Sequence, residues 1–439
     1  MIQNSLISIV AISALLFGAV YPWAIAIVAI VTVIPFIYFL WKGNGYDMEF
    51  KDGKGIILVC LVLFAYPLFQ LVPLPLSLLS VVHPKLKEII AISPNTPLMF
   101  HSISLNPFAT EKEVSRLFLC LAVFSMAAFG IRDEDGVYKV IRSLVVFGFI
   151  LGVFALIQHA TSNGKIYWFW SPISRNAWLT FGPFVNRDHF AGFIGMIIPF
   201  SIGITFMSRR IEKKVMYAFL GVGTAIALFF TLSRGGIISF FAGLLVFSYV
   251  LFTKGISKKK LIPIVLFVLV LTAYLLFFGV SPIIEKFAQS KESSAARFLA
   301  WQATLSAFRD YPVFGSGFGT FQYIFKVYQP EGLRLYWAHA HNDYLELLLE
   351  LGIVGTVIVV SFFVLVLGTI MKADWRGREL YLGASLLASI TTIAVHSIVD
   401  FNLHIPSNAI LFSLILGLAV SLSRATMSTS ETRLPWHHG

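Results

Sequence analysis

Long apolar runs without charged residues constrain this chain more than any other feature. No Asp, Glu, Lys or Arg occurs before Lys42. Residues 1–41, interrupted at Tyr21-Pro22-Trp23, are predicted to form a hairpin of two membrane-spanning helices, because one span takes about 20 residues. A secretory signal peptide is the competing interpretation, but it would begin with a basic segment. Ten further apolar runs bring the prediction to about twelve transmembrane helices in an all-α polytopic membrane protein: 55–84, 117–131, 143–164, 189–208, 215–233, 235–253, 261–284, 351–371, 380–399 and 401–423.

The composition agrees with a membrane protein. Hydrophobic residues make up 57% of the chain and charged residues only 13%, whereas about a quarter of the residues of a soluble domain are charged. The net charge of +11 could indicate a nucleic-acid partner, but the charges separate apolar runs instead of clustering on a soluble face, so no nucleic acid is expected. Cys60 and Cys120 lie inside apolar runs, and their spacing predicts neither a disulfide framework nor a metal site.

The distribution of basic residues predicts the orientation. With the N-terminus inside, more than half of the Lys and Arg residues fall in the short inner segments, as the positive-inside rule requires. Both termini are therefore expected to be cytoplasmic. The predicted organisation is nine spans in 1–280 with an outer segment at 73–112 that caps or gates the bundle, a large outer loop at 281–343, three spans in 344–423, and a cytoplasmic tail at 424–439.

The large outer loop contains a predicted helix from Ala295 to Asp310, which ends before Pro312 and a glycine cluster. Trp301, Leu305 and Phe308 follow one another at helical spacing and predict one apolar face. Arg297 lies one turn before Trp301 on the same face, where an unpaired charge would be unfavourable.

Ionisable residues at the outer ends of spans are candidate site residues. They are Arg187 in Asn186-Arg187-Asp188-His189, Arg234 in Ser233-Arg234-Gly235-Gly236, Arg297, and His339 and His341 in Trp337-Ala338-His339-Ala340-His341-Asn342-Asp343. Each has a structural alternative: the arginines can anchor at the interface or bind nearby carboxylates and helix carbonyls, and His341 can bind a neighbouring carbonyl at a helix entry. Asp343 with Glu346 is typical of a capping-box start, and Glu346 and Glu350 are expected to mark the exposed top of the tenth span.

Three arginines and a histidine on one side of the membrane suit a particular chemistry. The guanidinium group of arginine binds phosphate oxygens through two parallel hydrogen bonds and can stabilise a diphosphate leaving group without a metal. Histidine can accept the proton of an attacking hydroxyl. The combination predicts transfer of a group from a lipid-linked diphosphate to an alcohol. The metal-dependent alternative is a DxD motif at Asp133-Glu134-Asp135, but this triplet is predicted to lie on the opposite, inner side as a solvated acidic turn.

The same region resembles the O-antigen ligase and polymerase superfamily. The resemblance is carried by Arg297-Phe298-Leu299-Ala300-Trp301, by Pro312-Val313-Phe314-Gly315-Ser316-Gly317, and by His341-Asn342 followed after nine residues by Gly352-Ile353-Val354-Gly355. The segments around Arg187 and Arg234 are also similar to segments of that group. In the ligases the first arginine is often followed three residues later by leucine, whereas Trp301 stands four residues after Arg297.

The resemblance implies a metal-independent, inverting GT-C glycosyltransferase without a cofactor, in the bacterial inner membrane and with a periplasmic active site. His341, with His339 as second candidate, would activate the acceptor hydroxyl, and Arg187, Arg234 and Arg297 would hold the diphosphate of an undecaprenyl-diphosphate-linked glycan donor. The acceptor would be lipid A core in a ligase or a lipid-linked glycan in a polymerase, and the His-Asn-x9-Gly-x-x-Gly spacing favours a ligase. A secondary transporter is the alternative of another class, although its site would lie at the membrane midplane.

Overall fold

The computed structural model describes residues 1–42, 53–82, 85, 100–172, 180–256, 290–333 and 336–431, and this part of the chain is almost entirely helical. The long helices of the bundle are α1 (Ile2–Leu15), α2 (Pro22–Trp41), α3 (Gly53–Phe69), α6 (Pro107–Gly130), α7 (Glu134–Ala160), α8 (Arg187–Met207), α9 (Ile211–Phe230), α10 (Arg234–Thr253), α15 (Asp343–Lys372), α16 (Arg378–His396) and α17 (Pro406–Glu431). The shorter elements are η1 (Phe17–Ala19), β1 (Pro73–Pro75), α4 (Leu76–Val82), β2 (Phe100–Ser102), α13 (Ser290–Asp310), α14 (Phe321–Tyr328) and η4 (Asn402–His404).

Nine helices of the described residues are long and apolar enough to cross a membrane. The helices α1 and α3 are apolar but shorter, with 14 and 17 residues. The predicted span 261–284 lies outside the described residues. The chain is thus an all-α polytopic membrane protein, and the count of about twelve spans stays a prediction.

Two predicted spans have different bounds in the structure. The span expected at 117–131 is part of α6, which begins at Pro107, where the side chain of Asn106 accepts a hydrogen bond from the Ala109 N–H at 3.1 Å. The charges in the first turns of α6 hid this start from a hydropathy criterion. The span expected at 55–84 ends at Phe69, because 73–75 instead pair with 100–102 as an antiparallel two-stranded sheet.

The buried centre of the bundle is α8, which packs against α16 and α10. Small residues permit the close approach, as in many membrane helix pairs. A Cβ on Gly203 of α8 would lie 2.8 Å from the carbonyl oxygen of Tyr381, and one on Gly243 of α10 would lie 2.7 Å from that of Ala388. These contacts hold α8, α10 and α16 close to one another within the bundle.

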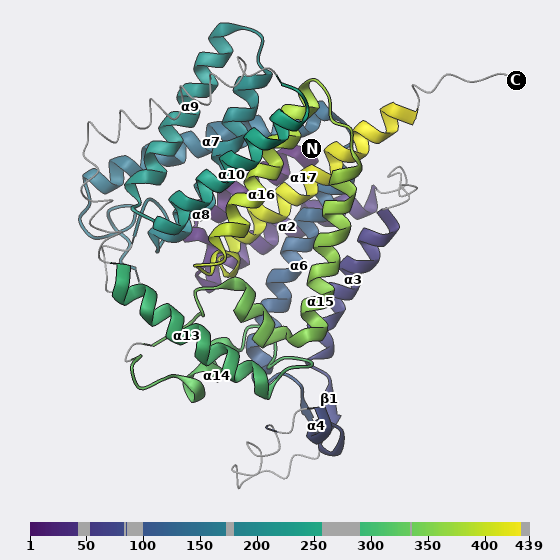
Figure 1. Cartoon of the computed structure of the whole chain (residues 1–439), viewed down its shortest axis with the longest axis vertical. Helices are drawn as coiled ribbons and strands as arrows, with labels where there is room; N and C mark the ends of the chain where they lie inside the picture. Colours follow the sequence, from purple (N-terminus) through teal and green to yellow (C-terminus); the bar gives the residue numbers. More distant parts are fainter. Residues whose placement is uncertain are drawn as a thin grey trace, which may run out of the picture.

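The two ends of the bundle differ. The elements α13, α14, β1 and α4 gather at one end, and the N-terminus lies toward the other (Figure 1). At the N-terminal end of α16, Arg378 forms ion pairs with Glu134 at 3.0 Å and with Asp135 at 3.1 Å. Since α16 has 19 residues, this acidic turn lies about 27 Å from the other end of that helix. Asp133 caps α7 by accepting from the Gly136 N–H, so the DxD triplet is held in structural contacts.

The helix α15 is broken at Gly352, whose φ is 63°. The glycine cluster after α13 docks into this break: the Ile353 N–H donates to the Pro312 carbonyl at 2.8 Å. A Cβ on Gly352 would lie 2.4 Å from the backbone nitrogen of Gly315, which itself has a φ of 76°. Both glycines are therefore required for the loop to approach the helix. The break separates a short outer segment of α15 from its long spanning part.

The predicted apolar face of α13 is confirmed in part. Phe308 packs against the buried cluster that contains Ala300, Ala303 and Ala307, and Trp301 is partly buried. Leu305 is 41% exposed, so the prediction is wrong for this residue. The fully buried positions of the helix are the small residues, because α13 packs closely there.

Candidate active site

The candidate site begins with the loop before α15. Asn342 caps this helix by accepting from the N–H groups of Tyr344 and Leu345, both at 3.1 Å. The cap is thus Asn342, not the predicted pair of Asp343 and Glu346. His341 precedes it with a φ of 51°, a left-handed conformation that non-glycine residues rarely adopt. The indole of Trp301 on α13 donates to the Ala340 carbonyl at 3.0 Å and fixes the loop from above.

His339 forms a close pair with a buried carboxylate. Its Nδ1 lies 2.7 Å from Oε1 of Glu346, and Oε2 of Glu346 accepts from the Ala340 N–H at 2.8 Å. Glu346 and Glu350 are each 1% exposed, so the prediction that they mark an exposed helix top is wrong. The burial of Glu346 is compatible with a charge because several donors surround it. This geometry fixes the His339 ring and leaves its Nε2 for another partner.

A third histidine lies between two carboxylates. Nδ1 of His404 donates to Asp343 at 2.8 Å, and its Nε2 lies 3.3 Å from Glu346. Burial acts to lower the pKa of His404, but the carboxylates of Glu346 and Asp343 outweigh it and raise this pKa to about 10. His404 is therefore an imidazolium at neutral pH, and it balances the charge of the two carboxylates beneath His339.

His341 has its own carboxylate partner. Its Nδ1 lies 3.4 Å from Oδ1 of Asp400, which is on the loop between α16 and α17. The other oxygen of Asp400 accepts from the side-chain amide of Asn402 at 3.3 Å and lies 3.9 Å from Nε2 of His396. Burial acts to raise the pKa of Asp400, but the hydrogen bond from His341 and the neighbouring histidines lower it below its ordinary value. Asp400 is thus a carboxylate that can orient His341.

Phe401 holds the two candidate histidines at a fixed spacing. The His339 ring stacks on it with a centroid distance of 4.2 Å, and the His341 ring meets it edge-on at 4.8 Å. Their side chains are 27% and 29% exposed, so both rings remain accessible. The sequence prediction grouped these two histidines only by their spacing along the chain.

The three predicted arginines lie near one another at the end of the bundle that carries α13. Arg187 begins α8, Arg234 begins α10, and Arg297 is on α13. Arg297 and Arg187 act on Arg234 by charge repulsion, and the carboxylate of Asp188 acts on it by attraction. Among the described residues no hydrogen-bond partner reaches the buried Nε of Arg187. Like charges brought together in this way favour a bound anion.

The arginines and the histidines are neighbours. A Cβ on Gly235, next to Arg234, would lie 2.8 Å from Cδ2 of His396, and the charge of Arg297 acts on His396. His396 in turn approaches Asp400, the partner of His341. His396 and Asp400 therefore connect the arginines with His341.

One residue group could hold a metal ion. The ligand atoms of His339, Glu346 and His404 lie within 4.8 Å of one another. A metal ligand must be a neutral imidazole. In the structure Nδ1 of His404 is directed to Asp343, and its Nε2 lies 3.3 Å from Glu346. The three residues form a hydrogen-bonded network, and a bound metal ion would have to replace the contacts of His339 and His404 with Glu346.

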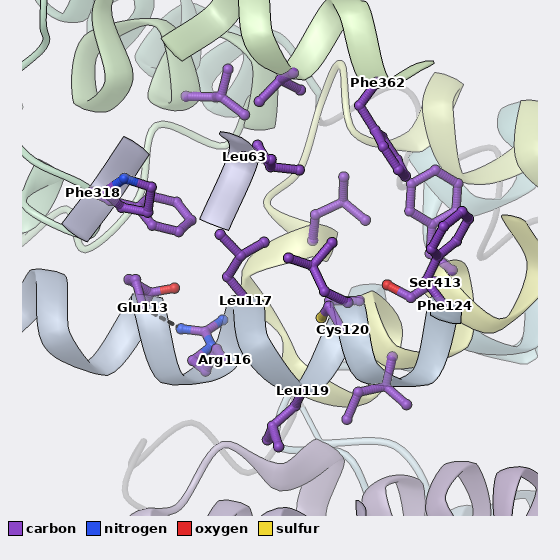
Figure 2. Close-up of a pocket in the computed structure, with 18 of the residues that line it drawn as sticks. Leu63, Glu113, Arg116, Leu117, Leu119, Cys120, Phe124, Phe318, Phe362 and Ser413 are labelled. Carbon is purple, nitrogen blue, oxygen red and sulfur yellow. Dashed lines mark hydrogen bonds and ion pairs between the residues drawn. The ribbon is translucent and has the colours of Figure 1, made fainter. Parts of the chain in front are cut away.

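Two cavities are lined in part by α6, and both include Glu113 and Arg116. The smaller has a volume of about 200 Å³ and is lined by apolar residues of α3, α6, α15 and α17. Figure 2 shows Glu113 and Arg116 of α6 paired at one end of this cavity. The larger has a volume of about 820 Å³, lies between α2 and α6, and reaches His339 and His404.

The sequence prediction missed Asp400, His404 and the role of Asp343. Asp400 and His404 lie in Val399-Asp400-Phe401-Asn402-Leu403-His404, at the outer boundary of two predicted spans. The criterion applied to the arginines, an ionisable residue at the outer end of a span, also marks these two residues.

Comparison with known families agrees with the position of the site. Residues 217–360 match the family model described as O-antigen ligase, and no curated protein matches the chain. The matched segment contains Arg234, Arg297, His339 and His341, whereas Arg187 lies before it. The match supports the resemblance of this segment to the O-antigen ligase and polymerase superfamily.

Proposed function

We propose that the protein transfers a glycan from undecaprenyl diphosphate to an acceptor hydroxyl at the periplasmic face of the bacterial inner membrane, and that it is an O-antigen ligase with lipid A core as acceptor. One observation carries this proposal: two carboxylate-paired histidines lie beside three clustered arginines at one end of the bundle. A secondary transporter would instead place its ionisable site near the membrane midplane.

In this proposal the arginines bind the donor. Arg187, Arg234 and Arg297 bind the oxygens of the diphosphate and stabilise the charge that develops on it as it leaves. The permanent charge of arginine makes a metal unnecessary for this step.

In this proposal the histidines activate and position the acceptor. Because Nδ1 of His341 is directed to Asp400, its Nε2 is available to take the proton of the acceptor hydroxyl. The acceptor oxygen forms its bond to the anomeric carbon as the bond from that carbon to the diphosphate breaks, and undecaprenyl diphosphate leaves with the electron pair. A single displacement of this kind inverts the configuration. His339, held by Glu346, lies beside the acceptor and positions it.

The test is a transfer assay with purified protein in lipid nanodiscs. An undecaprenyl-diphosphate glycan is offered together with two competing acceptors, lipid A core and a second lipid-linked repeat. Extension of lipid A core is expected. Extension of only the lipid-linked repeat would identify a polymerase, and the absence of transfer to either acceptor would refute the proposed function. His101→Ala, a half-buried histidine of β2 outside the site, is the matched control for variants of His341.

A further inference from the structure

The larger cavity forms a groove between α2 and α6. Its apolar wall on α2 includes Ile25, Ala29 and Val33, which recur every four residues on one face of the helix. From Pro22 to Val33 this wall extends about 16 Å, roughly half the thickness of the hydrocarbon core. Ile30, which does not line the groove, is 60% exposed on the same helix. The wall of this α2–α6 groove therefore suits an apolar chain.

The polar end of the α2–α6 groove is basic. Lys112 lies at this end with its Nζ 4.2 Å from the ring centroid of the exposed Phe108, and among the described residues no carboxylate is within ion-pair distance of it. Arg116 is paired with Glu113 and also donates to the carbonyl oxygen of His404. The charge of Lys112 is thus the uncompensated one. A lipid with an apolar chain and a phosphate headgroup has the complementary distribution.

The groove reaches the histidines without including the arginines. The residues that line the groove include His339 and His404 but none of Arg187, Arg234 and Arg297. The arginines adjoin His341 through His396 and Asp400. In the proposed function the arginines bind the diphosphate of the donor, so the phosphate-binding end of the groove is available for the second substrate, the acceptor.

We propose that the α2–α6 groove binds the acceptor lipid, with an acyl region of lipid A core along α2, a phosphate at Lys112, and the sugar hydroxyl directed past His339 toward the donor. This inference rests on the proposed function.

Two groove variants test the proposal, each with a matched control. Lys112→Glu reverses the uncompensated charge, and its control Lys326→Glu alters another lysine over an aromatic ring, here Tyr336. Ala29→Trp fills the groove, and its control Ile30→Trp places the same ring on the exposed face of α2. Both groove variants are expected to raise the KM for lipid A core about tenfold or more, with the KM for the donor unchanged. The controls are expected to behave as wild type.

Binding of labelled lipid A core and of labelled undecaprenyl diphosphate, measured without turnover, separates this inference from the proposed function. If wild type transfers nothing but Ala29→Trp still weakens lipid A core binding selectively, the proposed function fails and the groove assignment stands. If transfer occurs and neither groove variant changes the KM for the acceptor, the assignment is overturned. Loss of donor binding in the groove variants, or displacement of lipid A core by phosphatidylglycerol at equal concentration, would also overturn it.

Discussion

Replacement of His404 by leucine tests the buried charge network beneath the candidate site. His404 is the cation between Asp343 and Glu346, and its side chain is only 11% exposed. A pKa that rises from 6.5 to about 10 corresponds to about 5 kcal/mol in favour of the protonated form. Breaking a buried ion pair by removing one partner typically costs about 3–5 kcal/mol. We therefore expect His404→Leu to lower the free energy of unfolding by about 3–5 kcal/mol at pH 7.

The stabilisation by His404 is expected to depend on pH. A histidine whose pKa is raised in the folded state contributes stability that is complete below pH 6.5 and is lost as the pH rises through about 10. The melting temperature in detergent, followed by tryptophan fluorescence, should therefore differ between wild type and His404→Leu at pH 7 and converge near pH 10.5. Asp343→Asn in the His404→Leu background should recover part of the loss, because it removes one uncompensated carboxylate. A difference that is below about 1 kcal/mol, or that stays constant from pH 7 to pH 10.5, would refute the reasoning.

Three further predictions concern the site, the broken helix and the acidic turn. Asp400→Asn should lower kcat about 10²-fold or more and leave the donor KM unchanged, because His341 loses its orienting carboxylate; steady-state kinetics would decide, and an unchanged kcat would exclude this role. Gly352→Ala should destabilise the protein by about 1–3 kcal/mol, because Gly352 has a φ of 63° and a Cβ at this position has no room. The control Gly368→Ala lies in the same helix, where a Cβ meets open space, and should stabilise the protein slightly. Melting curves that do not separate the two variants would contradict the packing argument. Asp135→Asn and EDTA should each leave the transfer rate unchanged; a loss of turnover that magnesium restores would instead support a metal-dependent reaction.

The helices were the most predictable part of this chain. Long charge-free runs leave little choice in a bilayer, where every backbone polar group must be satisfied within the element. The bounds were less certain where charges enter a helix, as at the start of α6, and where an apolar stretch leaves the helix, as after Phe69. Hydropathy measures the preference for lipid, and it does not report where a backbone conformation changes.

The candidate site was only partly predictable. The three arginines and two histidines were marked by charge at the outer ends of spans, and the structure places them as neighbours. Their partners come from distant parts of the sequence: Asp400 is 59 residues from His341, and His404 is 61 residues from Asp343. Such pairings depend on how α15, α16 and α17 pack, which no local pattern in one sequence encodes.

The buried carboxylates show the same limit. Asp343 and Glu346 were predicted to form a capping-box start, and Glu346 and Glu350 to mark the exposed top of the helix, because acidic residues are typical of a helix N-terminus. Burial became possible through the imidazolium of His404 and the donors of the histidine loop, which together satisfy both carboxylates. The tertiary contacts thus place these helix-start carboxylates in a buried network with His404.

The most direct test of the central claim, that His341 takes the acceptor proton while the arginines hold the donor, is the transfer rate of purified His341→Ala protein measured alongside its affinity for undecaprenyl-diphosphate glycan. The prediction is a rate reduced at least about 10²-fold with donor affinity equal to that of wild type and of His101→Ala. A transfer rate equal to that of wild type would contradict the assignment of His341 as the base.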